Sequence, residues 1–289
     1  MGLTDEVCLS IILPTKNESA AIARTLQAIV AVHPNAEVIV VNDGSTDDSA
    51  SVAEAAGAKV IHHPYGKGNG AAIKTGARAA QGGILLFMDA DGQHDPADIP
   101  RLLAKLDEGF DMVVGARDGL SQASVWRRFA NGLYNCLASY MTGHRIEDLT
   151  SGFRTARAEK FREFLHLLPN GFSYPTTSTM AFFRAGYSVA YEPIYAAPRI
   201  GNSHIRILRD GTRFLIIIFK IGTLYSPLKL FGPTSLLMFL LASVWYGWTW
   251  WHDGRFTNMS ALLYTGSVIT FMMGLISEQI TALMYKADR

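Results

Sequence analysis

Three oxygen-bearing side chains alternate along one short stretch of the chain: Asp89, Asp91 and Gln93. They follow an apolar run, residues 84–88, that predicts a buried strand. Side chains two positions apart point the same way in an extended chain, so both carboxylates can converge on one cation. Carboxylate and amide oxygens suit Mg²⁺ or Mn²⁺, and Mg²⁺ commonly joins protein carboxylates to substrate phosphates. The spacing therefore predicts a site for a cation and a diphosphate; a surface loop rich in Asp and Gly is the alternative.

The elements around this stretch alternate between strands and helices, a pattern typical of βαβ units and a mostly parallel α/β sheet. Residues 17–19 and 42–48 carry Asn, Asp and Ser side chains of the kind that cap helices. Ligands bind at the carboxyl ends of strands in such sheets, so Asn17, Glu18 and Asp43 are expected at the same edge as the acidic stretch. The predicted strands are 7–13, 37–41, 59–62, 84–88 and 111–115, with a helix at about 97–108.

A glycine-rich stretch, residues 66–72, superficially fits a dinucleotide-binding fingerprint. The match is weak because this stretch follows the third predicted strand, whereas a true fingerprint joins the first strand to its helix. The sequence also contains no Gly-x-x-x-x-Gly-Lys-Ser/Thr phosphate loop. Two interpretations stay open: the glycines let a sugar or phosphate approach the backbone, or they form a plain tight turn.

The composition describes a soluble part followed by an apolar, basic one. Hydrophobic residues make up 49% of the 289 residues and the formal net charge is +1, which argues against a nucleic-acid partner. Residues 206–289 carry eight Lys/Arg and four Asp/Glu, whereas the first 205 residues carry 18 and 21. Cys8 and Cys136 predict reduced thiols rather than a disulfide framework. Residues 1–6 lack the basic and apolar regions of a signal peptide.

The C-terminal part predicts attachment to a membrane. Residues 205–227 mix basic and apolar side chains, which favours an interfacial amphipathic helix; a buried core helix is the alternative. Residues 228–289 predict a transmembrane hairpin with spans at about 230–251 and 259–285. The first span holds 22 residues without a charge, and as a helix it reaches about 33 Å, enough to cross a bilayer.

The basic residues beside the hairpin predict its orientation. Lys229 and Lys286 flank its two ends, and Arg255 lies in the connecting loop. The positive-inside rule then places residues 1–204 in the cytoplasm, so the chain is expected to be a multi-pass protein of the cytoplasmic membrane. Glu278 lies about two turns inside Lys286, where an acidic side chain predicts a contact between subunits or with a lipid head group. Snorkelling, or pairing with a nearby basic side chain, is the alternative.

Four motifs follow one another along the chain: Pro-Thr-Lys-Asn-Glu (14–18), Val-Asn-Asp-Gly-Ser-Thr-Asp (41–47), Lys-Gly (67–68) and Asp-Ala-Asp-Gly-Gln (89–93). Taken in this order, they resemble the motifs of family 2 glycosyltransferases. The resemblance covers about residues 7–205, and the apolar hairpin fits it too. Three later motifs resemble the polyprenyl-phosphate branch, which includes dolichyl-phosphate mannose synthases; they span residues 113–117, 148–154 and 199–203. The resemblance implies a glycosyltransferase A-type (Rossmann-like) catalytic domain over 1–204, followed by the interfacial region and the hairpin.

The resemblance also implies roles on the donor side. A nucleotide-sugar, linked to uridine or guanosine diphosphate, would bind beside a divalent ion, Mg²⁺ or Mn²⁺. The donor-binding residues would be Pro14, Thr15, Asn17, Glu18, Asp43, Lys67 and Asp89, with Arg199 and Ser203 on a loop that closes over the donor. The metal ligands would be Asp89, Asp91 and Gln93. The aromatic residue common before Asn-Glu is Lys16 here, which departs from the family pattern and removes a stacking partner for the base.

The acceptor implied by the resemblance is a polyprenyl phosphate, such as undecaprenyl or dolichyl phosphate. Its phosphate would be received by Arg117, Arg127, Asn131, Ser151 and His204. Asn131 stands where the family has Ser, and His204 stands where a Lys is frequent, which would make phosphate binding sensitive to pH. The ordinary alternatives are a solvated surface charge for Arg117 and a simple turn at 151–152. Residues 172–177 lack the Gln/Glu pair of the mannose-type enzymes, so the sugar stays open.

The predicted reaction is metal-dependent sugar transfer at the cytoplasmic membrane face by inverting direct displacement. Asp89, Asp91 and Asp148 are the candidate catalytic residues, with Asp148 positioning groups first and acting as a base second. Two other functions stay open: a membrane polysaccharide synthase, although no Gln-x-x-Arg-Trp element is present, and a non-catalytic membrane protein that binds nucleotide-sugars. A homo-oligomer could form through the hairpin.

Overall fold

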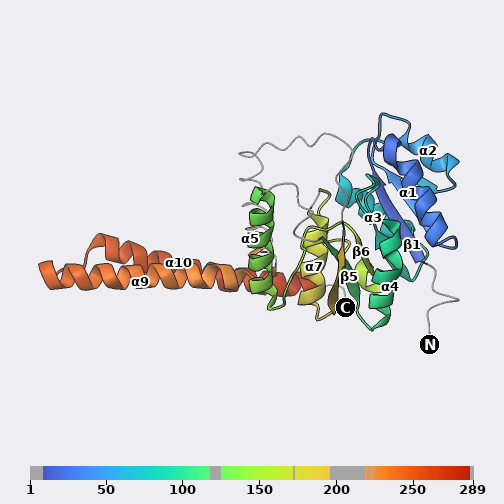
Figure 1. The fold of residues 1–289 in the computed structure, drawn as a ribbon. Coiled ribbons are helices and arrows are strands. Elements are labelled where there is room, and N and C mark those ends of the chain that lie inside the picture. The colour runs from blue at the N-terminus through green and yellow to red at the C-terminus, as the bar shows by residue number, and fades with distance from the viewer. Residues whose placement is uncertain are drawn as a thin grey trace. The chain divides into compact units, whose positions relative to one another are not determined.

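The structure is a computed structural model that describes residues 9–117, 125–171, 173–195, 219, 222–223 and 225–286, without the side chains of 125–131 and 285–286. Its contacts divide the chain into two compact units, Met1–Ile205 and Arg206–Arg289. The elements of the first unit are β1 (Leu9–Thr15), α1 (Ser19–Val32), β2 (Glu37–Asn42), α2 (Ser49–Ala55), β3 (Lys59–His62), α3 (Asn69–Ala79), β4 (Ile84–Phe87), η1 (Pro96–Asp98), α4 (Ile99–Asp107), β5 (Met112–Arg117), α5 (Val125–Thr142), β6 (Arg154–Arg157), α6 (Ala158–Glu163), α7 (Tyr174–Arg184) and β7 (Val189–Ile194) (Figure 1).

The first unit is built on a seven-stranded sheet in the order β3-β2-β1-β4-β6-β5-β7. The strands run parallel except β6, which pairs antiparallel with both β4 and β5. The prediction of a mostly parallel α/β sheet is therefore confirmed. Short, continuously apolar strands such as β4, in which every residue is buried, are typical of a sheet covered on both faces.

Alternation along the strands divides the apolar side chains between two cores. Ile11 and Leu86 belong to the core that contains residues of α1, α2 and α4. Their neighbours face the other way: the side chain of Ile12 meets Gly76 of α3, and the ring of Phe87 lies 4.5 Å from that of Phe161 in α6. Because successive side chains of a strand point to opposite faces of the sheet, each strand contributes apolar side chains to both cores.

The ends of four predicted strands differ from the structure: β2 runs one residue further, to Asn42, and β4 ends one residue earlier, at Phe87. Strand β1 was expected to stop before Pro14, yet it continues to Thr15. Beyond Ile12 the strand pairs with β2 alone, since the pairing with β4 ends at the Ile12–Phe87 pair, and a proline lacking an N–H is tolerated at such a one-sided position. Strand β5 covers Met112–Arg117 rather than 111–115.

The expected helix cap at 17–19 is also corrected. Helix α1 begins after Glu18 without a capping bond from its own N-cap side chain. The cap comes from the neighbouring loop instead: Asp47 Oδ2 accepts from the Ser19 N–H at 3.2 Å, and its Oδ1 accepts from the Ser49 N–H at 3.1 Å. One carboxylate therefore serves the first turns of both α1 and α2. Burial acts to raise the pKa of Asp47, but the bonds from Ser49 and Ser19 lower this pKa to about 2.

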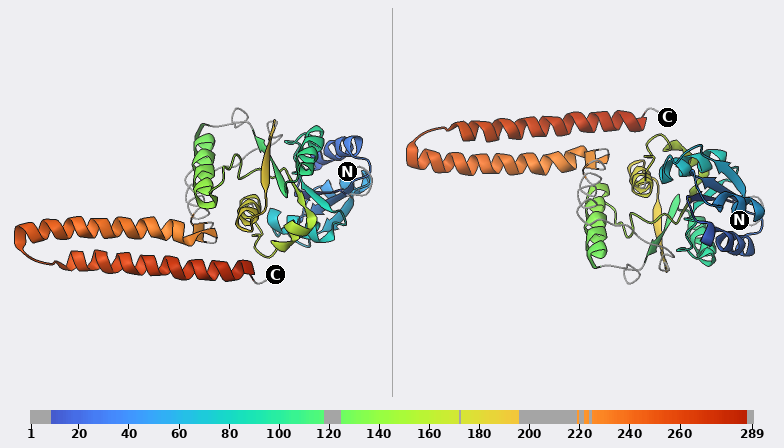
Figure 2. Two further views of the ribbon diagram at one scale, coloured as in Figure 1. Left: turned by 90° about the horizontal axis from the view of Figure 1, so that it is seen from below. Right: turned by 90° about the horizontal axis from the view of Figure 1, so that it is seen from above.

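The second unit contains two long antiparallel helices, α9 (Pro227–Asp253) and α10 (Asn258–Lys286), which lie side by side in both views of Figure 2. Both are long and apolar enough to cross a membrane: the segments Pro227–Asp253 and Asn258–Met284 hold 27 residues each, and each contains an 18-residue window with a mean hydropathy of 1.5 and 1.7, respectively. Most of their large apolar side chains are exposed, as in a helix pair surrounded by lipid rather than by protein. The predicted interfacial region 205–227 lies largely outside the described residues.

Polar contacts join the two long helices. Ser235 and Ser267 each donate a side-chain hydroxyl to the other's backbone carbonyl at 2.9 Å, which satisfies both hydroxyls in an apolar setting. The carboxylate of Glu278 accepts from the backbone N–H of Leu228 at 3.3 Å. Leu228 lies in the first turn of α9, where backbone N–H groups lack helical partners. Glu278 thus has a capping contact inside the hairpin, which the sequence-based alternatives did not include.

Candidate active site

A cavity of about 400 Å³ opens at the carboxyl edge of the parallel strands. It lies where β2, β1 and β4 end side by side, and neighbouring strands in a sheet are about 4.8 Å apart. The loops after these three strands can therefore meet around one ligand. The described residues that line the cavity are Pro14, Thr15, Lys16, Glu18, Asp43, Gly68, Asn69, Asp89, Ala90, Asp91 and Gln93.

The acidic stretch after β4 lines this cavity as a group. Asp89, Asp91 and Gln93 all contribute, and Asp91 is only 8% exposed. The Gln93 N–H donates to Asp91 Oδ1 at 3.1 Å, which holds the stretch in a tight turn. Within the described residues no group of three or more His, Cys, Asp or Glu side chains is arranged to hold a metal ion. A pair of carboxylates completed by substrate phosphate oxygens and water is nevertheless a common arrangement for Mg²⁺, so the donor set fits this class of ion.

Asp43 follows β2 and lies on the same cavity, almost fully buried. Its Oδ1 is 2.8 Å from His63 Nδ1 and accepts from the Lys67 N–H at 2.7 Å, while its Oδ2 accepts from the Gly68 N–H at 2.8 Å. Burial acts to raise the pKa of Asp43, but these hydrogen bonds outweigh it and hold the pKa below its usual value. The carboxylate therefore orders the glycine-rich loop as well as facing the cavity.

Two predicted donor-binding residues have structural contacts and are not among the lining residues. Asn17 adopts a left-handed backbone (φ 57°), a conformation that Asn tolerates better than most residues. Its side-chain oxygen accepts from the Thr46 N–H at 2.8 Å, which ties the loop after β1 to the loop after β2. The Lys67 ammonium lies 5.8 Å from the ring centre of Tyr65. In contrast Lys16, noted in the sequence as a departure, lines the cavity.

The glycine-rich start of α3 packs against another part of the chain. A Cβ atom on Gly68 would lie 2.3 Å from the carbonyl oxygen of Asn170, and one on Gly70 would lie 2.1 Å from that of Pro169. The N–H groups of Gly70 and Ala71 donate to the carbonyls of Gly171 and Asn170 at 3.2 Å. The glycines therefore allow this backbone contact, while Gly68 still lines the cavity. Close backbone packing was not among the two interpretations that the sequence left open.

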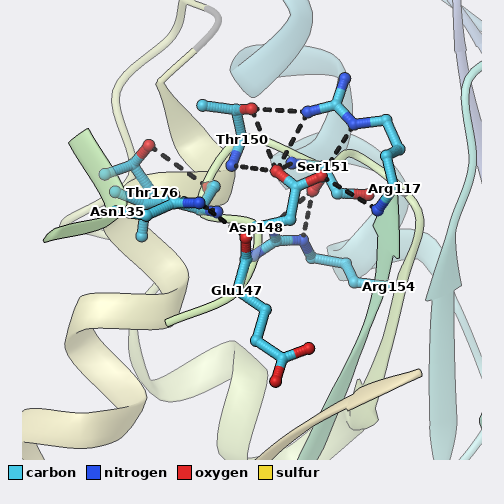
Figure 3. A network of polar contacts seen from close by, with 9 residues as sticks. Arg117, Asn135, Glu147, Asp148, Thr150, Ser151, Arg154 and Thr176 are labelled. Carbon is cyan, nitrogen blue, oxygen red and sulfur yellow. Dashed lines mark hydrogen bonds and ion pairs between the residues drawn. The ribbon is translucent and has the colours of Figure 1, made fainter. Parts of the chain in front are cut away.

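A second polar group lies in the loop before β6 (Figure 3). The Arg117 guanidinium donates from Nε to Asp148 Oδ2 at 2.8 Å and from Nη2 to Asp148 Oδ1 at 3.0 Å. Asp148 Oδ1 also accepts from the N–H groups of Thr150 and Ser151. Burial raises the pKa of the Asp148 carboxyl, but Arg117 and these N–H groups together lower it below its usual value. Asp148 is thus held as a carboxylate with most of its acceptor positions in use.

Arg154 contacts the same loop before β6, and the sequence analysis did not single it out. Its side chain is fully buried, and burial lowers the pKa of its guanidinium. It donates to the Ser151 carbonyl, to the Pro175 carbonyl at 2.7 Å, and to the hydroxyls of Ser178 and Thr179 at 2.8 and 3.0 Å. This buried cation joins the loop to the first turns of α7. The sequence feature that could have identified Arg154 is its position at the end of the motif 148–154.

The other residues predicted to bind the acceptor phosphate differ in whether they are buried and in whether the structure describes them. Ser151 is fully buried, so in this structure its hydroxyl does not reach a ligand from solvent. Arg127 and Asn131 fall within α5 by their backbone, but their side chains lie outside the described part. His204 of this group, like Arg199 and Ser203 of the predicted donor-binding group, lies outside the described residues altogether. Among the described side chains of this predicted group, the structure therefore brings Arg117 and Ser151 together around the predicted catalytic residue Asp148.

Comparison with known proteins gives two matches to family models. The model described as glycosyl transferase family 2 matches residues 10–165. The model described as the GtrB C-terminal hairpin matches residues 226–283. The first match covers the strands and loops that build the cavity, and the second covers the two long apolar helices.

Curated relatives match nearly the whole chain. An undecaprenyl-phosphate 4-deoxy-4-formamido-L-arabinose transferase of Shewanella sediminis is 30% identical over 94% of this chain and 86% of its own length. Glycosyltransferase AglJ of Haloferax volcanii is 27% identical over 98% of this chain and 96% of its own length. Among solved structures, glucosyl-3-phosphoglycerate synthase of Mycobacterium tuberculosis with Mn²⁺ and UDP-glucose aligns with a TM-score of 0.61 at 24% identity, covering 75% of this chain and 78% of that one. This last similarity is one of fold.

Proposed function

The chain belongs to glycosyl transferase family 2, and from this premise we propose that it transfers a sugar from a nucleotide-sugar to a polyprenyl phosphate at the cytoplasmic face of a membrane. The observation that carries the proposal is the cavity lined by Asp89 and Asp91 in a chain that also has two helices of membrane-spanning length. The names of the relatives support the lipid acceptor, since one acts on undecaprenyl phosphate by its description. The matched hairpin supports attachment to the membrane that holds such a lipid.

The donor would occupy the cavity with its nucleoside toward Asp43 and its diphosphate toward Asp89. Strand β1 separates β2 from β4, which leaves about 10 Å between the two loops, a span that suits a nucleoside diphosphate. Pro14, Thr15 and Glu18 would line the nucleoside part. Asp89, Asp91 and Gln93 would hold a divalent ion on the diphosphate, and such an ion would stabilise the charge that develops on the leaving group. The related fold that was solved with Mn²⁺ and UDP-glucose supports a metal of this kind.

The acceptor would enter from the side of Arg117. A phosphate monoester is largely ionised near neutral pH because its second pKa is about 6, so its oxygen can attack without a strong general base. In the proposed step this oxygen forms a bond to the anomeric carbon while the bond to the diphosphate oxygen breaks on the opposite face, which inverts the configuration. Asp148 would position Arg117, since both of its carboxylate oxygens already accept from that guanidinium. Arg127, Asn131 and His204 are the further proposed acceptor residues, while the buried Ser151 would act only through its backbone N–H on Asp148. Arg199 and Ser203 would cover the donor.

The orientation of the hairpin is part of the proposal. Lys229 lies near the start of α9 and Lys286 at the end of α10, both at the open end of the hairpin, whereas Arg255 lies in the connection between α9 and α10. The positive-inside rule places the two lysines, and with them the catalytic unit, in the cytoplasm. Nucleotide-sugars would then reach the cavity from the cytoplasm while the acceptor stays in the bilayer.

The experiment that tests this function uses the full chain in membranes supplied with polyprenyl phosphate and radiolabelled UDP- and GDP-sugars. We expect a labelled product that extracts with lipid, is released by mild acid, and requires Mn²⁺ or Mg²⁺. A labelled polymer would instead indicate a polysaccharide synthase. Binding of a donor without any product would indicate a nucleotide-sugar-binding protein, and either outcome would refute the proposal.

A further inference from the structure

The loop that carries Asp148 also touches the predicted metal-binding loop. A Cβ atom added to Gly152 would lie 2.9 Å from Asp89 Oδ2 and 3.5 Å from both Cγ and Oδ1 of the same residue. Real Cβ atoms essentially never approach another heavy atom so closely, so any side chain at 152 requires a shift. The Asp89 carboxylate supplies all three nearest atoms, and it lines the donor cavity.

The backbone around Gly152 is held on every side. The Ser151 carbonyl accepts from Arg154, the Gly152 carbonyl accepts from the Tyr174 hydroxyl at 3.2 Å, and the Phe153 carbonyl accepts from the Gly115 N–H at 2.9 Å. Arg154 and Tyr174 are both fully buried, so moving this backbone would break hydrogen bonds in the protein interior. An added side chain at 152 would therefore displace the Asp89 carboxylate rather than the loop.

A second contact joins the same two loops. The ring of His94 stacks on that of Phe153, with 5.1 Å between the ring centres and 19° between the planes. His94 is buried and directly follows Gln93. The loop after β4 is thus packed against the loop before β6 at two points, one at Asp89, where the acidic stretch begins, and one at His94, directly after it. This packing limits how the metal-binding side chains can reorganise.

We propose that Gly152 is a positioning residue for the donor metal: the absence of a side chain there sets the place of the Asp89 carboxylate in the cavity. The inference rests on the proposed function, because it takes Asp89 as a metal ligand. It assigns to the motif 148–154 a role toward the donor, in addition to its proposed role toward the acceptor. Residues that orient a metal ligand without binding the metal commonly change metal affinity by about 10- to 100-fold when replaced.

The test measures Mn²⁺ affinity rather than turnover. The full chain in detergent is titrated with MnCl₂ in the presence of saturating UDP or GDP, whichever supports Mn²⁺ binding by the wild type, and free Mn²⁺ is followed by electron paramagnetic resonance. We expect Gly152→Ala to weaken Mn²⁺ binding by about 10-fold or more. The control is Gly132→Ala, on the exposed surface of α5, where an added Cβ would meet no described atom within 4 Å. That variant should bind Mn²⁺ like the wild type.

A double-mutant cycle separates an effect through Asp89 from general damage. If Gly152 acts through this carboxylate, adding Gly152→Ala to Asp89→Asn should change Mn²⁺ affinity by less than about 2-fold, because the group that it displaces is already impaired. The inference would be overturned if the losses of Mn²⁺ affinity in the two single variants added up in the double variant. It would also be overturned if Gly152→Ala bound Mn²⁺ with the affinity of the wild type. If Gly152→Ala does not fold, Asp89→Ala/Gly152→Ala should recover folding, since the clash is then removed; failure to recover folding would overturn the inference as well.

The outcome for the wild type separates this inference from the proposed function. A wild-type chain that shows no nucleotide-dependent Mn²⁺ binding with either UDP or GDP would refute the metal site itself. Normal binding by the wild type together with normal binding by Gly152→Ala would refute only the positioning role.

Discussion

The loop that follows β4 and the loop that precedes β6 both present aspartates, but the surroundings of these carboxylates differ. Asp89 and Asp91 line the cavity at the strand ends. Asp148 is not among the described lining residues, and it accepts from Arg117, Thr150 and Ser151. The carboxylates of the first loop thus line the cavity, whereas the second loop uses its carboxylate to hold an arginine and its own backbone. Position in the fold, rather than residue type, separates the two sets of carboxylates.

Replacing Asp91 by Asn is the strongest test of the cavity side of this comparison. Asn has nearly the same shape but loses the negative charge that would hold the cation, and the ion is expected to contribute several kcal/mol to the reaction. We expect sugar transfer to fall by more than about 100-fold, equivalent to about 3 kcal/mol. The measurement is lipid-product formation, with circular dichroism to show that the variant is folded. Turnover within about 2-fold of the wild type would place the metal elsewhere.

Replacing Arg154 by Lys tests the structural role of the loop before β6. An ammonium group cannot reach the two carbonyls and two hydroxyls that the buried guanidinium serves together, so buried acceptors lose their donor. We expect the free energy of unfolding to fall by about 3 kcal/mol, measured by denaturant unfolding. Arg145→Lys is the matched control, because Arg145 is 88% exposed and its change should stay within about 0.5 kcal/mol. Equal losses in the two variants would contradict the scaffold role.

Replacing Asp148 by Asn sharpens the contrast between positioning and base catalysis. A positioning residue leaves the ionisation of the acceptor unchanged, so we expect sugar transfer to fall by about 10-fold, whereas loss of a general base costs about 10²- to 10⁴-fold. The pKa of Asp148 is already lowered. The dependence of the rate on pH, measured from about pH 3 to about pH 8 so that it includes the range in which Asp148 would titrate, should keep its shape in the variant. Loss of one limb of that profile would establish Asp148 as a base instead.

Replacing Asp47 by Asn gives the smallest effect and depends on pH. The pKa of Asp47 in the folded chain is about 2, below its ordinary value of 3.8. The ionised carboxylate therefore stabilises the fold above pH 3.8, and this contribution is lost as the pH falls toward about 2. We expect Asp47→Asn to lower the unfolding temperature at neutral pH by a few degrees, and the difference from the wild type to shrink on acidification. A difference that is independent of pH would show that the charge does not matter.

Several features of the fold followed from local patterns. Continuous apolar runs such as 84–88 predicted buried strands, and their alternation with helices predicted a mostly parallel sheet, because a strand covered on both faces needs no polar side. The placement of Asp43 and Asp89 at one edge followed from the same rule, since parallel strands direct their carboxyl ends to the same side. The two long apolar segments could be predicted as helices of membrane-spanning length from their length and composition alone.

Other features depend on residues that meet only in three dimensions. The cap of α1 comes from Asp47, far along the chain, and the end of β1 depends on where β4 stops pairing. The close approach of Gly152 to Asp89 and the burial of Arg154 likewise join segments that the sequence keeps apart. Local patterns report what a residue can do. Long-range packing decides which groups a residue contacts. Only the tertiary structure therefore distinguished an aspartate that lines the cavity from one that holds an arginine and its own loop in place.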